Sequence, residues 1–323
     1  MTYTISVHLG PDEIHERMSA DAIAGLRAEH KSIPPVWFYD ERGSQLFEEI
    51  TRLPEYYPTR AERHLLQAHS LQIAELSKAD TLVELGAGAC DKTRVLLDGM
   101  VEAGTLARYI PFDVSDDFLR GAASSLSEEY DSLEVHLVIG DFHRHLAEIP
   151  TDGRRMIAFL GGTIGNFDPS QRERFLFDLN CTMSSDDSLL IGTDLVKDTA
   201  RLVAAYDDAA GITAAFNKNV LHVLNAQLGG DFDVEKFTHI ARWNQDEQCI
   251  EMRLSATEAT SVNLTAADLR VEFAPGEEIL TEISSKFTPE RVATELSAAG
   301  FVVDGTWGAE QGEFLLTLAH PYC

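Results

Sequence analysis

Residues able to contact a ligand follow the ends of successive apolar runs in this sequence. They are Gly86 and Gly88 after the first run, Asp113 after the second, Asp141 and Phe142 after the third, and Asn166 after the fourth. Glycines permit a tight turn and leave no Cβ in the way of a ligand. A carboxylate about 20 residues past such a turn can accept hydrogen bonds from both ribose hydroxyls. An Asp followed by an aromatic ring suits an adenine base, so the pattern predicts a site for a nucleoside-bearing cofactor.

Other interpretations of these residues stay open at this point. The dinucleotide fingerprint G-x-G-x-x-G does not fit, because Asp91 stands where its third glycine would fall. A plain tight turn with no ligand would use Gly86 and Gly88 in the same way. Asp113 could instead cap the helix that follows it, and Asn166 could cap its own loop.

The elements that must position these residues alternate between apolar runs and helical segments, as in a doubly wound parallel sheet. The predicted strands cover residues 82–85, 109–114, 135–139, 156–160 and 188–195. Asp91 is the predicted N-cap of the first crossover helix, and Asp168-Pro169 begins a later one. Carboxyl ends of parallel strands meet at one edge of a sheet, so the candidate residues should lie there together.

The alternation stops after residue 196, which predicts a second lobe. Residues 197–228 are helical with an interruption at Gly211, and strand-like runs follow up to residue 287. Thr288-Pro289 then begins a helix, and runs at 301–303 and 314–318 form a last strand pair. We therefore expect residues 61–196 and 287–323 to form a Rossmann-like α/β domain, and residues 1–60 and 197–286 to form an α+β substrate-binding lobe.

Composition excludes several classes of function. The formal net charge is −27, from 26 basic and 53 acidic residues, which opposes binding to a nucleic-acid backbone. No apolar run approaches a membrane span of roughly 20 residues, and the N-terminus does not read as a secretion signal. The four cysteines and eleven histidines have no metal-binding spacing. We expect a cytoplasmic, metal-free protein, and a monomer, that binds neither nucleic acid nor membrane.

Several motifs together resemble a known family. Glu84-Leu-Gly-Ala-Gly88 has the acid-x-Gly-x-Gly form of S-adenosylmethionine (SAM) methyltransferases. Further motifs are Trp37-Phe-Tyr-Asp40, Leu53-Pro-Glu-Tyr-Tyr-Pro-Thr59, Phe159 to Asn166 and Gly192-Thr-Asp-Leu-Val-Lys-Asp198, and the resemblance that they carry extends over almost the whole chain. The sequence resembles the histidine-specific, SAM-dependent methyltransferases of ergothioneine biosynthesis, which make hercynine. The segments 201–219 and 276–287 are as specific as the cofactor motifs.

The resemblance implies a role for particular residues. By this resemblance, SAM is contacted by Gly86, Lys92, Asp113, Asp141 and Phe142. The substrate L-histidine is contacted by Tyr56 and Tyr206 at its carboxylate, by Asn166 and the Gly161 backbone at its α-amine, and by Glu282 and Ser284 at its imidazole. Glu282 and Ser284 are two apart in a predicted strand and therefore face the same way. Tyr206, Thr213 and Phe216 would share one helix face if Gly211 does not break the helix.

The implied reaction is three successive methylations of the α-amine of histidine, which depend on aligning amine, methyl and sulfur. Asn166 and the Gly161 carbonyl would orient the amine lone pair, and Tyr39 is a candidate hydroxyl for the later steps, with bulk water as the alternative. A methyltransferase for another small amine, a nicotinamide oxidoreductase and a silent histidine-binding module are the competing hypotheses.

Overall fold

The computed structural model describes residues 3–88, 92–114, 116–130, 132–309 and 312–322. In this part of the chain the backbone separates into two compact units. Unit 1 comprises Met1–Leu9, Pro58–Val196 and Phe287–Cys323, and unit 2 comprises Gly10–Tyr57 and Lys197–Lys286.

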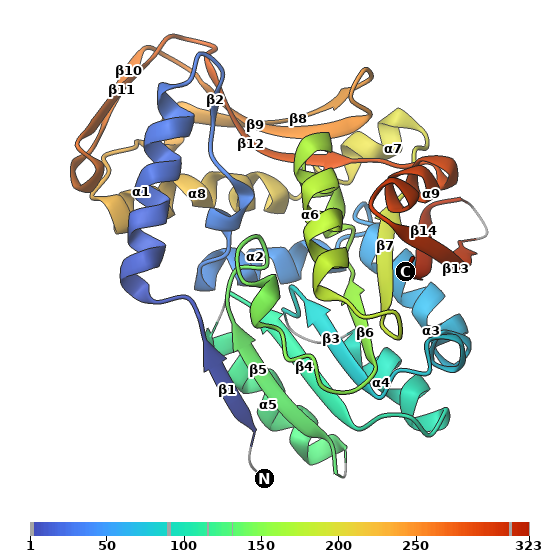
Figure 1. The fold of residues 1–323 in the computed structure, drawn as a ribbon. Helices are drawn as coiled ribbons and strands as arrows, with labels where there is room; N and C mark the ends of the chain where they lie inside the picture. The colour runs from blue at the N-terminus through green and yellow to red at the C-terminus, as the bar shows by residue number, and fades with distance from the viewer. Residues whose placement is uncertain (1–2, 89–91, 115, 131, 310–311, 323) are drawn as a thin grey trace. The chain divides into compact units, whose positions relative to one another are not determined.

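Unit 1 is built on one large sheet with the strand order β1-β5-β4-β3-β6-β7-β14-β13 (Figure 1). The strands are Thr4–Val7 (β1), Thr81–Leu85 (β3), Arg108–Asp113 (β4), Glu134–Ile139 (β5), Arg155–Phe159 (β6), Ser188–Asp194 (β7), Phe301–Gly308 (β13) and Phe314–Pro321 (β14). Neighbouring strands from β1 to β7 pair in parallel, whereas β14 pairs antiparallel with both β7 and β13. The predicted α/β fold with a final antiparallel pair is confirmed.

Helices cover both faces of this sheet because its central strands are apolar on both sides. Helices α3 (Pro58–Ser77), α4 (Thr93–Glu102) and α5 (Asp116–Glu129) pack on the face that includes Leu82. Helices α6 (Pro169–Thr182) and α9 (Pro289–Ala298) pack on the face that includes Val83. A short 3₁₀ turn at Leu146–Glu148 lies between β5 and β6, and another at Thr163–Asn166 lies between β6 and α6. The result is a three-layer unit, and Gly86, Asp113 and Asp141 lie at the strand ends of its middle layer.

Local sequence explains where these helices begin. The Asp168 side chain accepts a hydrogen bond from the Gln171 N–H, and the Gln171 side chain accepts one from the Asp168 N–H, which is a capping box. Pro169 follows at the first helical position, as predicted. The predicted N-cap Asp91 lies outside the described residues.

Unit 2 packs helices against a sheet with the order β2-β12-β9-β8, accompanied by the hairpin β10-β11. The strands are Lys31–Ser32 (β2), Phe237–Asn244 (β8), Cys249–Ala256 (β9), Thr260–Leu264 (β10), Leu269–Phe273 (β11) and Glu278–Ser285 (β12). The helices are α1 (Pro11–Arg27), α2 (Glu41–Arg52), α7 (Thr199–Ala204) and α8 (Ile212–Leu228), with 3₁₀ turns at Pro35–Phe38, Val234–Lys236 and Thr265–Ala267. Their apolar faces form one core with the sheet.

The sequence-based boundaries differ from the structure at the N-terminus. Residues 1–60 were assigned to one lobe, but Thr4–Val7 pairs in parallel with residues 136–139 and so extends the unit 1 sheet. The boundary at 196/197 coincides with that between the units, and the one at 286/287 does too. The substrate-binding role of unit 2 stays a prediction.

Gly211 interrupts the helical segment as expected, so Tyr206 does not share a helix face with Thr213 and Phe216. Gly211 adopts a left-handed conformation with φ of 74° and starts α8, whereas α7 has already ended at Ala204. Tyr206 therefore lies in the connection between two helices. A left-handed residue cannot continue a right-handed helix, and glycine adopts this conformation at little cost.

Candidate active site

The glycine turn after β3 is held open by hydrogen bonds to the end of the neighbouring strand β4. Gly86, with φ of 73°, donates its N–H to the Phe112 carbonyl over 2.8 Å. Gly88, with φ of 51°, donates its N–H to the Asp113 carboxylate over 3.1 Å. A Cβ built on Gly88 would meet no atom of the described residues within 4 Å, so the space on that side of the turn is open among them. The backbone is thus shaped for a ligand lying against it.

The acidic residue before this turn is a structural anchor within unit 1. Glu84 is buried and accepts hydrogen bonds from the hydroxyls of Tyr109, over 2.7 Å, and Thr93. Burial raises the pKa of Glu84 to about 7, against the opposing effect of those two hydrogen bonds. Glu84 therefore ties β3 to β4 and to the start of α4.

Asp141 and Phe142 follow β5, and the Phe142 ring lies next to the glycine turn. Asp141 is buried, and its carboxylate accepts the His143 N–H over 2.9 Å. The Phe142 ring packs edge-on against Phe159 with 5.5 Å between ring centroids. The same ring would lie 3.9 Å from a Cβ on Gly86. The structure therefore brings Gly86, Asp113 and Phe142 to one edge of the sheet, as the sequence predicts.

The loop after β6 carries the two residues predicted to contact the amine. Gly161 and Gly162 have φ of 79° and 69°, and the Thr163 hydroxyl donates to the Leu160 carbonyl over 2.8 Å. Asn166 is half-buried at the end of the loop, and no described residue makes a hydrogen bond with its side chain. An amide that none of the described residues engages is available to a ligand.

A buried carboxylate that the sequence analysis missed connects this loop to Lys92. Glu62, on α3, forms an ion pair with the Lys92 ammonium and accepts the Gly161 N–H at 2.7 Å. The sequence did contain an indication of this role, because Glu62 lies among the apolar residues Ala61, Leu65 and Leu66 of one helix. A charged residue on an apolar helix face needs a partner when it is buried.

In unit 2 the hydroxyls of two buried residues, Tyr206 and Ser284, both contact the buried ammonium of Lys286. The Tyr206 and Ser284 hydroxyls share a hydrogen bond of 2.7 Å, and Lys286 donates to Tyr206 over 2.9 Å and to Ser284 over 2.8 Å. The Lys286 ammonium also lies 4.7 Å from the centre of the Tyr206 ring. Lys286 is another residue that sequence reasoning missed, although its two-residue spacing from Ser284 along the chain was a signal.

The other predicted tyrosines join this cluster through aromatic contacts. The rings of Tyr56 and Tyr206 meet edge to face with 6.1 Å between centroids. Tyr56 also contacts Phe47, whose ring contacts Tyr39 at 5.7 Å. Tyr39 packs in turn on Phe216 at 5.6 Å. The predicted residues Tyr39, Tyr56, Tyr206 and Ser284 are therefore gathered in unit 2 although they are far apart in the sequence.

A β-bulge aims Glu282 into the core of unit 2. In β9, Met252 faces the core while its neighbours Glu251 and Arg253 face away. The register shifts between Leu280 and Glu282, so that Glu282 lies opposite Met252. Residues directly opposite each other share a face of the sheet. Without the extra residue, strict alternation would point Glu282 to the other face.

A polar network fixes this bulge. The Thr281 hydroxyl donates to the Asn217 side-chain oxygen over 2.6 Å and to the Met252 carbonyl over 2.9 Å. Asn217 donates to Nδ1 of His239 over 2.8 Å, and Nε2 of His239 donates to the Tyr206 carbonyl over 2.9 Å. Burial lowers the pKa of His239. The neutral ring therefore links the strand carrying Glu282 to the segment carrying Tyr206.

Burial also sets the charge of Glu282. This side chain is 8% exposed. Burial raises its pKa to about 7, and the Lys286 ammonium partly opposes this rise. A carboxyl group with such a pKa can exist in either form near neutral pH and can accept a hydrogen bond from an imidazole N–H.

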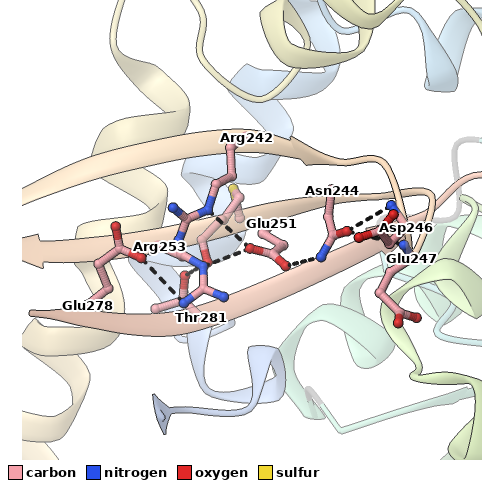
Figure 2. A network of polar contacts seen from close by, with 9 residues as sticks. Arg242, Asn244, Asp246, Glu247, Glu251, Arg253, Glu278 and Thr281 are labelled. Atoms are coloured by element: carbon pink, nitrogen blue, oxygen red, sulfur yellow. Dashed lines mark hydrogen bonds and ion pairs between the residues drawn. The ribbon is translucent and has the colours of Figure 1, made fainter.

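The opposite face of the same sheet is a charged ladder. Figure 2 shows Arg242, Glu251, Arg253 and Glu278 linked across β8, β9 and β12. The Glu251 carboxylate is 2.8 Å from Nε of Arg253. Alternation along β9 thus separates a partly buried ionic face from the face that carries Glu282 and Ser284.

Two possible features are absent from the described part of the chain. Within those residues, no three His, Cys, Asp or Glu side chains lie close enough together to hold a metal ion. Of the helices formed there, none has both the length and the hydropathy needed to cross a membrane.

The parallel sheet with its antiparallel end pair, the glycine turn and the carboxylates at neighbouring strand ends define the class of SAM-dependent methyltransferases. The model of the family described as "Histidine-specific methyltransferase, SAM-dependent" matches residues 18–321. The chain is 53% identical to the histidine N-alpha-methyltransferase of Mycolicibacterium smegmatis and 52% identical to that of Mycobacterium tuberculosis, covering 99% of this chain and of each relative. It is 30% identical to ergothioneine biosynthesis protein 1 of Neurospora crassa over 88% of this chain and 33% of that protein.

These matches place the chain in the histidine-specific, SAM-dependent methyltransferase family. The family predicted from the motifs is therefore confirmed, and with it the dependence on SAM as methyl donor. The roles of individual residues stay predictions.

Proposed function

We propose that this chain transfers methyl groups from SAM to the α-amine of L-histidine, three in succession, and so makes hercynine for ergothioneine biosynthesis. Two full-length relatives named histidine N-alpha-methyltransferase support this activity. The observation that carries the proposal is the buried cluster of Tyr206, Ser284 and Lys286 on the face of unit 2 that also holds Glu282. Such a set of donors and acceptors suits a small zwitterion with a polar ring.

The residues at the sheet edge of unit 1 fit SAM. The open space beside Gly88 would admit the cofactor, since a side chain there would fill it. Gly86, Lys92, Asp113, Asp141 and Phe142 would hold it, with the Phe142 ring packing on the adenine and the Asp113 carboxylate accepting from the ribose. When bound, SAM supplies the methyl group from its sulfonium.

The residues of unit 2 would hold the substrate by its two ends. Tyr56 and Tyr206 would donate to the histidine carboxylate, and Glu282 with Ser284 would bind the imidazole. An amine without a carboxylate should be rejected, because these buried hydroxyls would lose their partner.

The remaining task of the protein is to orient the amine. The nitrogen must be unprotonated to attack, and each methyl group that it gains removes one N–H donor. The Asn166 amide and the Gly161 carbonyl would fix the direction of the lone pair, which accounts for much of the rate in a displacement reaction. Tyr39 is the proposed hydroxyl that assists the later steps, and bulk water is the alternative.

Mass spectrometry tests this function directly. Incubated with L-histidine and SAM, the protein should give a product carrying three added methyl groups, and histamine should give none. A Glu282→Ala variant that keeps full histidine affinity would favour another small amine as substrate. Binding of NAD(H) without binding of SAM would instead favour an oxidoreductase.

We also propose that the protein acts as a monomer in the cytoplasm. Among the described cysteines, Cys181 and Cys249 are free thiols, which fits a reducing compartment. Light scattering after size-exclusion chromatography and cell fractionation test these two points.

A further inference from the structure

One buried carboxylate in unit 1 contacts both a residue predicted to bind SAM and a residue predicted to bind the substrate amine. Glu62 has no exposed side-chain surface, and its carboxylate pairs with the Lys92 ammonium. The same carboxylate accepts the Gly161 N–H through both oxygens, at 2.7 and 3.0 Å. Lys92 is the predicted contact to SAM and Gly161 the predicted contact to the amine of the substrate.

The neighbouring strand is shaped to admit this carboxylate. A Cβ on Gly192, in β7, would lie 2.2 Å from Oε1 of Glu62 and 3.0 Å from the ring of Phe314. No real pair of atoms approaches so closely, so any other residue at position 192 would displace Glu62. The carboxylate therefore occupies a space that the sheet leaves for it.

The energetics favour a fixed position for this group. A buried carboxylate is unfavourable unless it is paired and hydrogen-bonded, and here the ammonium and the backbone N–H supply both needs. Lys92 is held at its charged end, 3.5 Å from where a Cβ on Gly161 would be. The side chain of Lys92 and the loop at Gly161 therefore cannot move independently of Glu62.

We propose that Glu62 is a positioning residue that sets Lys92 and the Gly161 loop relative to each other, so that its loss weakens SAM binding and slows methyl transfer together. This inference rests on the proposed function. Glu62 acts through its two partners and does not itself touch the reacting atoms.

The test compares three variants with the wild-type chain. Glu62→Gln keeps an acceptor for the Gly161 N–H but cannot form the ion pair with Lys92. Gly192→Ala leaves the carboxylate in the chain and pushes it from its place. Both should raise the KM for SAM and lower kcat, by up to roughly 100-fold for a displacement of about 1 Å.

The matched control is Asp187→Asn. Asp187 is also a buried carboxylate that pairs with a cation, Arg155, and accepts that residue's N–H over 2.9 Å. It lies at the amino end of β6, whereas Gly161 follows the carboxyl end. Its replacement should lower stability without changing the KM for SAM or kcat.

Calorimetric titration with S-adenosylhomocysteine provides a readout independent of catalysis. Weaker binding in Glu62→Gln and Gly192→Ala, but not in Asp187→Asn, supports the inference. Wild-type affinity and kcat in the first two variants, or an equal loss in the control, overturn it. If the wild-type chain methylates no histidine, the proposed function fails, and the titration still decides the role of Glu62.

Discussion

Replacing Glu282 by Gln should make the protein more stable in mild alkali while weakening histidine binding. Burial in the folded chain raises the pKa of Glu282 to about 7, from the 4.5 of a glutamate in water. Between these values the native state binds more protons than the unfolded state, so stability falls as the pH rises from about 4.5 through 7. The Glu282→Gln variant has no carboxyl group to ionise at this position, so its stability does not fall in this way as the pH rises.

The magnitude follows from the shift. At about 1.4 kcal/mol per pKa unit, a rise of about 2.5 units, from 4.5 to 7, gives at most about 3 kcal/mol once both states have ionised. Most of this difference develops between pH 5 and pH 8. We therefore expect the free energy of unfolding of Glu282→Gln, relative to wild type, to increase by about 2 to 3 kcal/mol over that range.

Urea unfolding at pH 5 and pH 8, followed by tryptophan emission, measures this difference. Trp37 and Trp243 both lie in unit 2, where Glu282 is buried. The control is Glu272→Gln, an exposed carboxylate on β11, which should keep the wild-type pH dependence. Parallel pH dependences of Glu282→Gln and wild type would refute the argument. Histidine titration should show weaker binding by Glu282→Gln at pH 8.

Three further predictions concern other residues of the two units. Lys286→Met removes a charged donor from Tyr206 and should raise the Kd for histidine roughly tenfold, measured by calorimetry; an unchanged Kd would contradict its role. Thr281→Val removes the hydrogen bonds that hold the β-bulge and should raise the KM for histidine severalfold but not the KM for SAM. Equal changes in both KM values would argue that Thr281 does not act by orienting Glu282. Gly86→Ala should weaken SAM binding. The control is Gly104→Ala, at a turn with a similar φ of 70° and open space around it, which introduces the same backbone strain away from the predicted SAM site and should bind SAM normally.

Much of unit 1 could be predicted because its signals are local. The apolar run at Thr81–Leu85 can only be a strand buried on both faces, and Gly86 then marks the turn that opens the site. Asp168 and Pro169 fix the start of α6 through hydrogen bonds within four residues. The spacing of Asp113 from that turn was enough to place it at the same edge.

The features that could not be predicted depend on contacts between distant residues. The strand Thr4–Val7 is recognisable only through its partner at residues 136–139. The bulge before Glu282 depends on Asn217, which is 64 positions away from Thr281. The pairing of Glu62 with Gly161 spans 99 positions, and no local pattern encodes it. Local propensity identifies such residues as polar and buried but does not name their partners.

The path of the chain through unit 1 determines when that unit can assemble during synthesis. The strand Thr4–Val7 leaves the ribosome first but has no neighbour until residues 134–139 follow. The outer edge of β7 stays open until residues 314–321 have been made, after all of unit 2 has emerged. The nascent protein therefore carries one unpaired strand early in its translation, β1, and one unpaired edge late in it, that of β7, and such edges are prone to misassociate.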